Sequence, residues 1–210
     1  MGIDKTQVFN CDCMQGMSAF EDGYFDLAIV DPPYGIGAEN HAGNVKNGWT
    51  QWPVKSWDSI KPNSEYFKEL NRVSKNQIIW GGNYFTKQLS ESSCWIVWDK
   101  GQRDFSLADG ELAWTSFEKS VRIHTIHRGT ANQEEKLHPT QKPVSLYKWL
   151  LKNYAKEGDK ILDTHLGSGS IAIACHDYGF DLTACELDKD YYDASIKRLK
   201  NHISQIKLEL

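Results

Sequence analysis

Short apolar runs rich in Val, Ile and Phe alternate along this chain with longer segments of helical spacing. This alternation is typical of a mostly parallel sheet flanked by helices, because parallel strands need crossover connections. We therefore expect an α/β fold in which residues 1–210 form a single domain. The seven expected strands are 7–10, 25–30, 77–80, 94–98, 111–116, 160–163 and 182–186.

Two helices are predicted in the second half of the chain. Pro143 can occupy a first helical position, and the apolar residues that follow it form one face before Gly158. From about Asp188, apolar residues at three- and four-residue spacings predict an amphipathic C-terminal helix that packs on the sheet. The two apolar faces are Leu146, Trp149, Leu150 and Tyr154, and Tyr192, Ile196, Leu199, Ile203 and Ile206.

Composition excludes several classes of protein. With 40% hydrophobic residues and 25% charged residues, the chain can build one sizeable core, so disordered and fibrous classes are excluded. No apolar run approaches the roughly 18 residues of a membrane helix, and the N-terminus lacks the features of a signal peptide. We expect a cytoplasmic protein without a membrane partner.

Charge and cysteine content limit the partners further. The net charge of -4 gives no global attraction to nucleic acid, so any contact with a polyanion must come from a local patch. The five cysteines match no zinc-binding spacing, and we expect free thiols and no metal. Residues 35–62 and 122–138 show no period, and long irregular segments of this kind are often functional.

The string Asp31-Pro32-Pro33-Tyr34 directly follows the apolar run 25–30. Two prolines fix φ and remove two backbone donors, so a carboxylate, a carbonyl and an aromatic face are held at the carboxyl end of a strand. Such a site suits the exocyclic amine of adenine or cytosine, because the Asp31 carboxylate and the Pro32 carbonyl can accept its N–H groups. The simpler alternative is an ordinary exit from a strand in which Asp31 caps a turn.

A second pattern is a strand ending at Asp163, a glycine-rich turn and a helical start at Ile171. Such a turn lets a nucleotide-type cofactor approach the backbone, and Glu186 ends the next strand, where an acid accepts ribose hydroxyls. Read as Gly167-x-Gly169-x-x-Ala172, the turn also fits a dinucleotide fingerprint, so NAD stays open, as does a plain turn.

The third motif is His138-Pro139-Thr140-Gln141-Lys142-Pro143, just before the predicted helix. The Thr140 hydroxyl and the Lys142 ammonium could meet the carboxylate of an amino-acid cofactor. A turn ahead of a Pro-initiated helix is the simpler alternative.

In this order, D-P-P-Y, H-P-T-Q-K-P and D-x-x-x-G-S-G-S resemble the amino-group DNA methyltransferases of the permuted beta class, which modify adenine N6 or cytosine N4. The resemblance covers nearly the whole chain. It implies a Rossmann-like, circularly permuted class I methyltransferase fold, S-adenosylmethionine as cofactor, and double-stranded DNA as partner with its target base flipped. No metal is implied, because the sulfonium is itself a good leaving centre.

The resemblance also implies roles for individual residues. Asp31, Pro32, Pro33 and Tyr34 would hold the flipped base. Within the cofactor site, Gly167 and Gly169 would border the methionine part, Glu186 the ribose and Asp12 the adenine, with Thr140 and Lys142 near the carboxylate. The full predicted cofactor set is Asp12, Cys13, Asp31, Thr140, Lys142, Asp163, His165, Gly167, Ser168, Gly169, Ser170 and Glu186.

The chain departs from the family pattern at two places. The loop that usually opens D-P-F reads Asp163-Thr164-His165, which puts the apolar wall of the cofactor site in doubt. The recognition segment 117–137 is short, so recognition must be minimal, come from residues 35–62, or come from a second subunit, either a homodimer or a partner. Candidate DNA-facing residues, or an ordinary solvated face, are Arg122, His124, His127, Arg128, Lys46 and Lys55, and Trp49, Trp52 and Trp57 are candidate wedges.

Several functions remain open from the sequence. Asp31 favours adenine N6, since cytosine N4 enzymes of this family more often carry serine there. A nicotinamide-dependent oxidoreductase would explain the glycine turn and Glu186 but not the order of the three motifs. A non-catalytic DNA-binding subunit would explain the altered loop, although the intact D-P-P-Y motif argues against it. RNA or a protein amide is a further possible acceptor.

Overall fold

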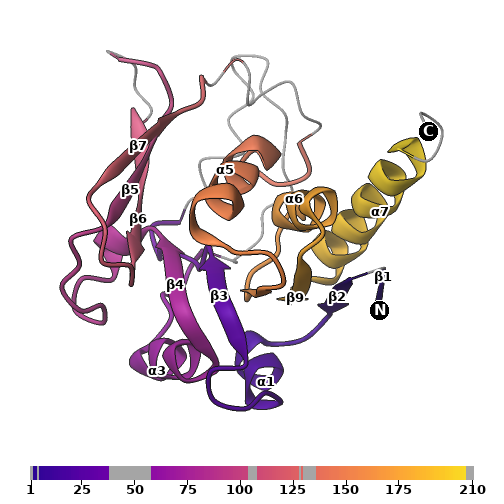
Figure 1. Cartoon of the computed structure of the whole chain (residues 1–210), viewed down its shortest axis with the longest axis horizontal. Coiled ribbons are helices and arrows are strands. Elements are labelled where there is room, and N and C mark those ends of the chain that lie inside the picture. The colour runs from indigo at the N-terminus through magenta and orange to yellow at the C-terminus, as the bar shows by residue number, and fades with distance from the viewer. Residues whose placement is uncertain are drawn as a thin grey trace.

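The computed structural model describes residues 2–3, 5–37, 58–103, 108–127, 129 and 136–206. Within them the strands form one nine-stranded sheet in the order β1-β2-β9-β8-β3-β4-β6-β5-β7 (Figure 1). The strands are β1 (Gly2–Ile3), β2 (Thr6–Phe9), β3 (Phe25–Val30), β4 (Ser74–Trp80), β5 (Trp95–Asp99), β6 (Gly110–Thr115), β7 (Arg122–Thr125), β8 (Lys160–Asp163) and β9 (Asp181–Cys185).

The predicted α/β class is confirmed, and all seven expected strands are present. The sheet has two further strands: the two-residue β1, antiparallel to β2, and β7, which pairs in parallel with β5. Strand β7 corrects the expectation of an irregular segment from residue 122. Its sequence, Arg-Ile-His-Thr, is short and mostly polar, so it carries little periodic signal, and its pairing with β5 depends on tertiary context.

Helices cover both faces of the sheet (Figure 1). On strand β3, Leu27 and Ile29 belong to the larger core cluster, whereas Ala28 and Val30 belong to the other. This alternation follows from the two-residue period of a strand, with both faces buried. Helices α5 (Val144–Tyr154), α6 (Ser170–Tyr178) and α7 (Lys189–Ile206) contribute to the first cluster, and α1 (Cys13–Ser18) and α3 (Ser64–Val73) to the second.

Both predicted helices are present, with a small shift at one end. Pro143 is the N-cap of α5 instead of its first helical residue, and the predicted face is buried except for the half-buried Trp149. In α7, Ile196 and Leu199 are buried, as the spacing predicts. In the described part of the chain, no helix has the length and apolarity needed to cross a bilayer.

The chain order places a crevice at the centre of the sheet. Strand β3 leads through α3 to β4 on one side, whereas β8 leads through α6 to β9 on the other, and β3 and β8 pair in parallel. Their crossovers therefore leave in opposite directions. In open α/β sheets, ligands bind outside the carboxyl ends of the strands at such a switch point.

Candidate active site

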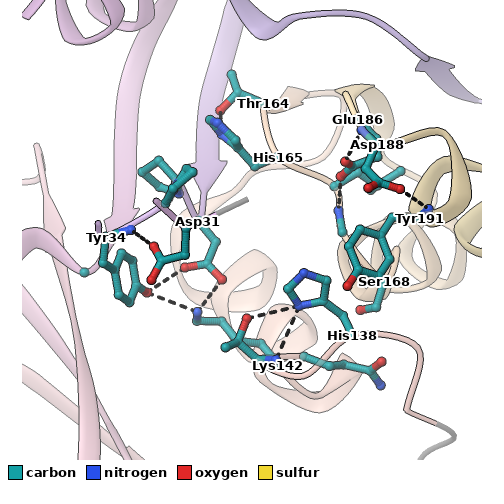
Figure 2. Close-up of a pocket in the computed structure, with 18 of the residues that line it drawn as sticks. Asp31, Tyr34, His138, Lys142, Thr164, His165, Ser168, Glu186, Asp188 and Tyr191 are labelled. Atoms are coloured by element: carbon teal, nitrogen blue, oxygen red, sulfur yellow. Dashed lines mark hydrogen bonds and ion pairs between the residues drawn. The ribbon is translucent and has the colours of Figure 1, made fainter. Parts of the chain in front are cut away.

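A cavity of about 1010 Å³ opens at this switch point, and Figure 2 shows the residues around it. It brings together all three motifs that the sequence singled out. The predicted residues that line it are Asp12, Cys13, Asp31, Pro32, Pro33, Tyr34, Thr140, Lys142, His165, Gly167, Ser168 and Glu186. The other three predicted residues, Asp163, Gly169 and Ser170, are buried next to the lining.

Asp31 stands at the end of β3 with its carboxylate toward the cavity (Figure 2). The Tyr34 hydroxyl donates to Oδ1 at 2.6 Å, and the Lys142 ammonium donates to Oδ2 at 2.5 Å. Each carboxylate oxygen has two lone pairs, so both retain capacity for a further donor. The carboxylate can therefore accept an N–H group from a ligand.

Asp58 caps the turn after the motif, a task that the simpler alternative gave to Asp31. Its buried carboxylate accepts the backbone N–H groups of Tyr34, Gly35 and Ile36 at 2.5, 2.9 and 3.2 Å. The sequence did not single out Asp58, because it lies 24 residues after Tyr34 in a segment without a period. This cap fixes the backbone that carries the Tyr34 ring.

The Tyr34 ring is held between aromatic neighbours and a glycine. It stacks on Tyr84, with ring centroids 5.0 Å apart and planes 17° apart. Burial first, and Asp31 second, raise the pKa of Tyr34 well above its usual value, so its hydroxyl stays protonated and donates. Gly81 has a φ of +68°, and a Cβ added there would lie 2.2 Å from the Tyr34 ring.

Replacing Gly81 with alanine should lower the free energy of unfolding by about 2–4 kcal/mol, because the left-handed backbone and the collision both cost energy. Gly179→Ala is the matched control, since Gly179 has a φ of +74° and nothing lies within 4 Å of an added Cβ. That variant should lose about 1–2 kcal/mol. Urea unfolding measures the free energy of both variants. Equal losses would show that the Tyr34 ring moves aside at no cost.

Lys142 is buried beneath the cavity and contacts the D-P-P-Y motif. Besides Asp31, its ammonium pairs with Glu111 at 3.1 Å and lies 3.3 Å from the Tyr34 hydroxyl oxygen. Glu111 also pairs with Lys100 at 2.7 Å. The cofactor contact predicted for Lys142 stays a prediction. Sequence reasoning missed Glu111 and Lys100, because charged residues at strand ends are common and usually solvated.

The glycine turn is anchored on Glu186. The Glu186 carboxylate accepts the backbone N–H of Gly167 at 2.7 Å through Oε2 and that of Asp188 at 2.9 Å through Oε1. Gly167 has a φ of +54°, and a Cβ there would point into open space apart from the His165 carbonyl at 4.0 Å. The backbone of the turn therefore faces the cavity directly.

His165 occupies the position where the family usually has phenylalanine. Burial lowers the pKa of His165 to about 4, so the ring is neutral at pH 7. Nδ1 lies 2.8 Å from the Thr164 hydroxyl, which is in turn 2.7 Å from the Tyr66 hydroxyl, and the Tyr66 ring meets the His165 ring edge-on. A neutral aromatic ring with a hydrogen-bonded Nδ1 thus borders the cavity.

Asp163 lies behind this ring and accepts the His165 backbone N–H at 3.0 Å. Burial raises the pKa of Asp163 to about 8, and the Asp31 and Glu186 charges add to the effect. The folded protein therefore binds a proton at Asp163 that the unfolded chain releases above about pH 4. Stability from this group falls as the pH rises from about 4 to about 8.

Asp163→Asn should remove this dependence, because an amide keeps the acceptor oxygen and does not titrate. The unfolding free energy of the wild type, minus that of the variant, should decrease between pH 5 and pH 8.5. Urea unfolding at both pH values measures the difference. A constant difference would mean that Asp163 titrates alike in the folded and unfolded chains.

Three further cofactor candidates, Asp12, Cys13 and Thr140, also line the cavity. The Thr140 hydroxyl lies 3.1 Å from Nδ1 of His138. Asp12 caps α1 by accepting the Met14 N–H at 2.8 Å, and burial raises the pKa of the adjacent Cys13 thiol to about 12. Among the residues that the structure describes, no group of three or more His, Cys, Asp or Glu side chains is placed to hold a metal.

The structure places three of the nine candidates for DNA contact or wedging. Arg122 and His127 are exposed, whereas the His124 ring stacks on Trp149 of α5 with centroids 4.5 Å apart. Burial lowers the pKa of His124, which makes it a packing residue more than a cation. The other candidates, Lys46, Lys55, Trp49, Trp52, Trp57 and Arg128, lie outside the described residues.

Comparison with known proteins agrees with this geometry. A family model described as a DNA methylase, N6_N4_Mtase, matches residues 79–197, more than half of the chain. The methylase YubD of Escherichia coli K12 is 25% identical over 207 residues, which cover 90% of this chain and 87% of YubD. The type II methyltransferase M.HpaI of Haemophilus parainfluenzae is 23% identical over 238 residues, covering 92% of this chain and 74% of M.HpaI.

Solved structures share the fold. The M1.HpyAVI–SAM complex superposes with a TM-score of 0.62 at 18% identity, covering 92% of this chain and 99% of that one. The PvuII cytosine-N4-specific DNA methyltransferase gives a TM-score of 0.60 at 11% identity, covering 96% of this chain and 92% of that one.

The cavity fits S-adenosylmethionine on its own chemistry. The glycine turn exposes backbone next to the Glu186 carboxylate, and ribose hydroxyls are donors that such a carboxylate accepts. Acidic side chains at the lining suit the positive charge of a sulfonium. Together with the family match over more than half of its length, this establishes that the chain belongs to the N6/N4 family of DNA methylases, which use S-adenosylmethionine to methylate amino groups in DNA.

Proposed function

We propose that this protein methylates the exocyclic N6 of adenine in DNA after extruding the base from the duplex. The observation that supports this proposal is the position of Asp31. Its carboxylate faces the same cavity as the glycine turn of β8, so a base amine and a cofactor can meet there. Aspartate at this position favours adenine, because family members that act on cytosine more often have serine.

The chemistry asks the protein to activate a weak nucleophile. The lone pair of the adenine amine is delocalised into the ring, and acceptors for its two N–H groups favour a pyramidal nitrogen with a localised lone pair. Asp31 provides one acceptor and the Pro32 carbonyl the other. When bound, S-adenosylmethionine supplies a methyl group on a positively charged sulfur. Asp31 need not be a strong base, because the methylated ammonium is acidic and loses its proton readily.

Orientation and desolvation are the remaining tasks of the chain. The stacked pair of Tyr34 and Tyr84 forms an aromatic wall at the cavity, on which a base can pack. Extruding a base from a duplex costs a few kcal/mol, which such contacts offset. The cofactor would be held by the glycine turn and Glu186, so the two reactants meet in fixed geometry.

The test is methyl transfer from S-adenosylmethionine to unmethylated genomic DNA, followed by mass spectrometry of the digested nucleosides. We expect N6-methyladenine. N4-methylcytosine would contradict the adenine assignment but would still agree with amino-group methylation of DNA. Binding of the cofactor without transfer to DNA would overturn the assignment of free DNA as substrate.

A further inference from the structure

Four charged side chains form a continuous series that begins at Asp31. Its carboxylate contacts Lys142 at 2.5 Å, Lys142 contacts Glu111 at 3.1 Å, and Glu111 contacts Lys100 at 2.7 Å. The four residues come from the end of β3, the segment before α5, strand β6 and the position after β5. The series thus joins three strands to the H-P-T-Q-K-P motif.

The Lys142 ammonium has an acceptor for each of its three N–H bonds. These acceptors are Asp31, Glu111 and the Tyr34 hydroxyl oxygen, and the Lys142 side chain is only 2% exposed. Burying an ammonium is costly unless carboxylates compensate its charge. Asp31 and Glu111 together supply that compensation.

Glu111 is the member that links the inner and outer cations. Although its burial raises the pKa, Lys142 and Lys100 outweigh that effect and hold the pKa of Glu111 at about 2. Its strand position is fixed, since Glu111 pairs with Trp98 across β5 and β6, and Lys100 lies over the Trp98 ring at 5.0 Å. Glu111 is therefore an anion with one carboxylate oxygen on Lys142 and the other on Lys100.

We infer that Glu111 is a positioning residue for methyl transfer: it fixes the Lys142 ammonium against Asp31 and so holds that carboxylate in one orientation toward the substrate amine. This inference rests on the proposed function and adds a residue outside the three sequence motifs. Without Glu111, Asp31 would be the single carboxylate in contact with Lys142. The ammonium would then shift toward Asp31, and the orientation of the Asp31 carboxylate would change.

The pH dependence follows from the groups around Lys142. Asp31 and Tyr34 face it from the end of β3 and Glu111 from β6, while Asp163 on β8 and Tyr147 on α5 lie in the same buried region. Burial alone would lower the pKa of Lys142, but Asp31 and Glu111 outweigh it and raise the pKa. Removing the Glu111 charge should lower that pKa, because a nearby negative charge stabilises the ammonium.

The experiment compares Glu111→Gln with the wild type in methyl transfer. We expect kcat to fall about 10–100-fold, with KM for S-adenosylmethionine nearly unchanged, because a misplaced reacting group costs that much. Activity should also decline at a lower alkaline pH than in the wild type. The matched control is Asp177→Asn, since Asp177 likewise contacts two side chains, Lys148 and His202, outside the cavity.

A second readout does not depend on turnover. In protein labelled with ¹³Cε-lysine, NMR titration of Lys142, assigned with Lys142→Arg, should show a lower pKa in Glu111→Gln than in the wild type. An unchanged Lys142 titration together with wild-type kcat would overturn the inference. A wild-type protein that methylates no DNA would overturn the proposed function, while the titration would still decide whether Glu111 governs Lys142.

Glu111→Asp covers the case in which the glutamine variant does not fold. It keeps the negative charge and shortens the side chain by one methylene group. We expect the alkaline decline to stay at the wild-type pH while kcat decreases, because charge is retained and position is not. A kcat equal to that of the wild type would contradict the positioning role.

Discussion

Asp31→Ala should lower kcat for methyl transfer by about 10²–10⁴-fold, the range typical of a group that acts directly on the reacting atoms. The variant lacks the carboxylate that we propose accepts a hydrogen bond from the base amine, whereas the glycine turn and Glu186 keep their own contacts. Binding of S-adenosylmethionine should therefore stay close to wild type. Single-turnover transfer measures the first effect, and calorimetric titration with the cofactor measures the second.

This variant leaves the buried Lys142 ammonium with one of its two carboxylate partners. Lys142 keeps Glu111 as a partner, so alanine at position 31 does not leave the buried ammonium without a carboxylate. Asp26→Asn is the matched control, because Asp26 lies on the same strand near its opposite end and pairs with Lys75 at 2.7 Å. The control should lose stability and keep kcat. Retained activity in Asp31→Ala would refute the role of the carboxylate.

The central strands could be predicted because their sequence pattern is strong. The buried stretches 27–30 of β3 and 161–162 of β8 are apolar without alternation, as expected for strands with helices on both faces. An acid comes directly after each stretch, Asp31 or Asp163. The edge strand β7 lacks this signal, since it is a four-residue, mostly polar string that is placed by its pairing with β5. Prediction therefore worked best at the buried centre of the sheet.

The same contrast applies to the site. Asp31 and Glu186 follow strands directly, and Gly167 lies in the turn after β8, so their convergence at one edge of the sheet follows from topology. Asp58 and Glu111 act through partners far away in sequence: Asp58 caps the turn at Tyr34 24 residues before it, and Glu111 reaches Lys142 across the fold. No local pattern marks such residues, because their role exists only once the sheet has formed.

Lys142 of the H-P-T-Q-K-P motif has a contact that the sequence did not predict. The motif predicts a cofactor contact for Lys142, and the structure brings its ammonium to the Asp31 carboxylate. Thr140, two residues earlier, lines the same cavity. The motif thus contributes both a contact to Asp31 and a residue of the cavity lining.

Glu186→Ala should weaken S-adenosylmethionine binding and largely keep kcat, whereas Asp31→Ala should lower kcat and keep binding. The carboxylate holds the N–H groups of Gly167 and Asp188 and is the expected acceptor for ribose hydroxyls. A hydrogen bond to a charged group contributes about 1.5–3 kcal/mol, so losing one or two of them should weaken S-adenosylmethionine binding roughly 100-fold. Calorimetric titration measures this loss.

At saturating cofactor, kcat of Glu186→Ala should recover to within about tenfold of wild type, because Asp31 and its partners are unchanged. Asp181→Asn is the matched control, since Asp181 begins the same strand β9 that Glu186 follows, at the end remote from the cavity, and should bind the cofactor normally. Wild-type affinity for S-adenosylmethionine in Glu186→Ala would show that this carboxylate does not bind the ribose. If instead both Asp31→Ala and Glu186→Ala impaired binding and kcat alike, the two halves of the cavity would act as one unit, and Asp31 would belong to the cofactor site as well as to the base.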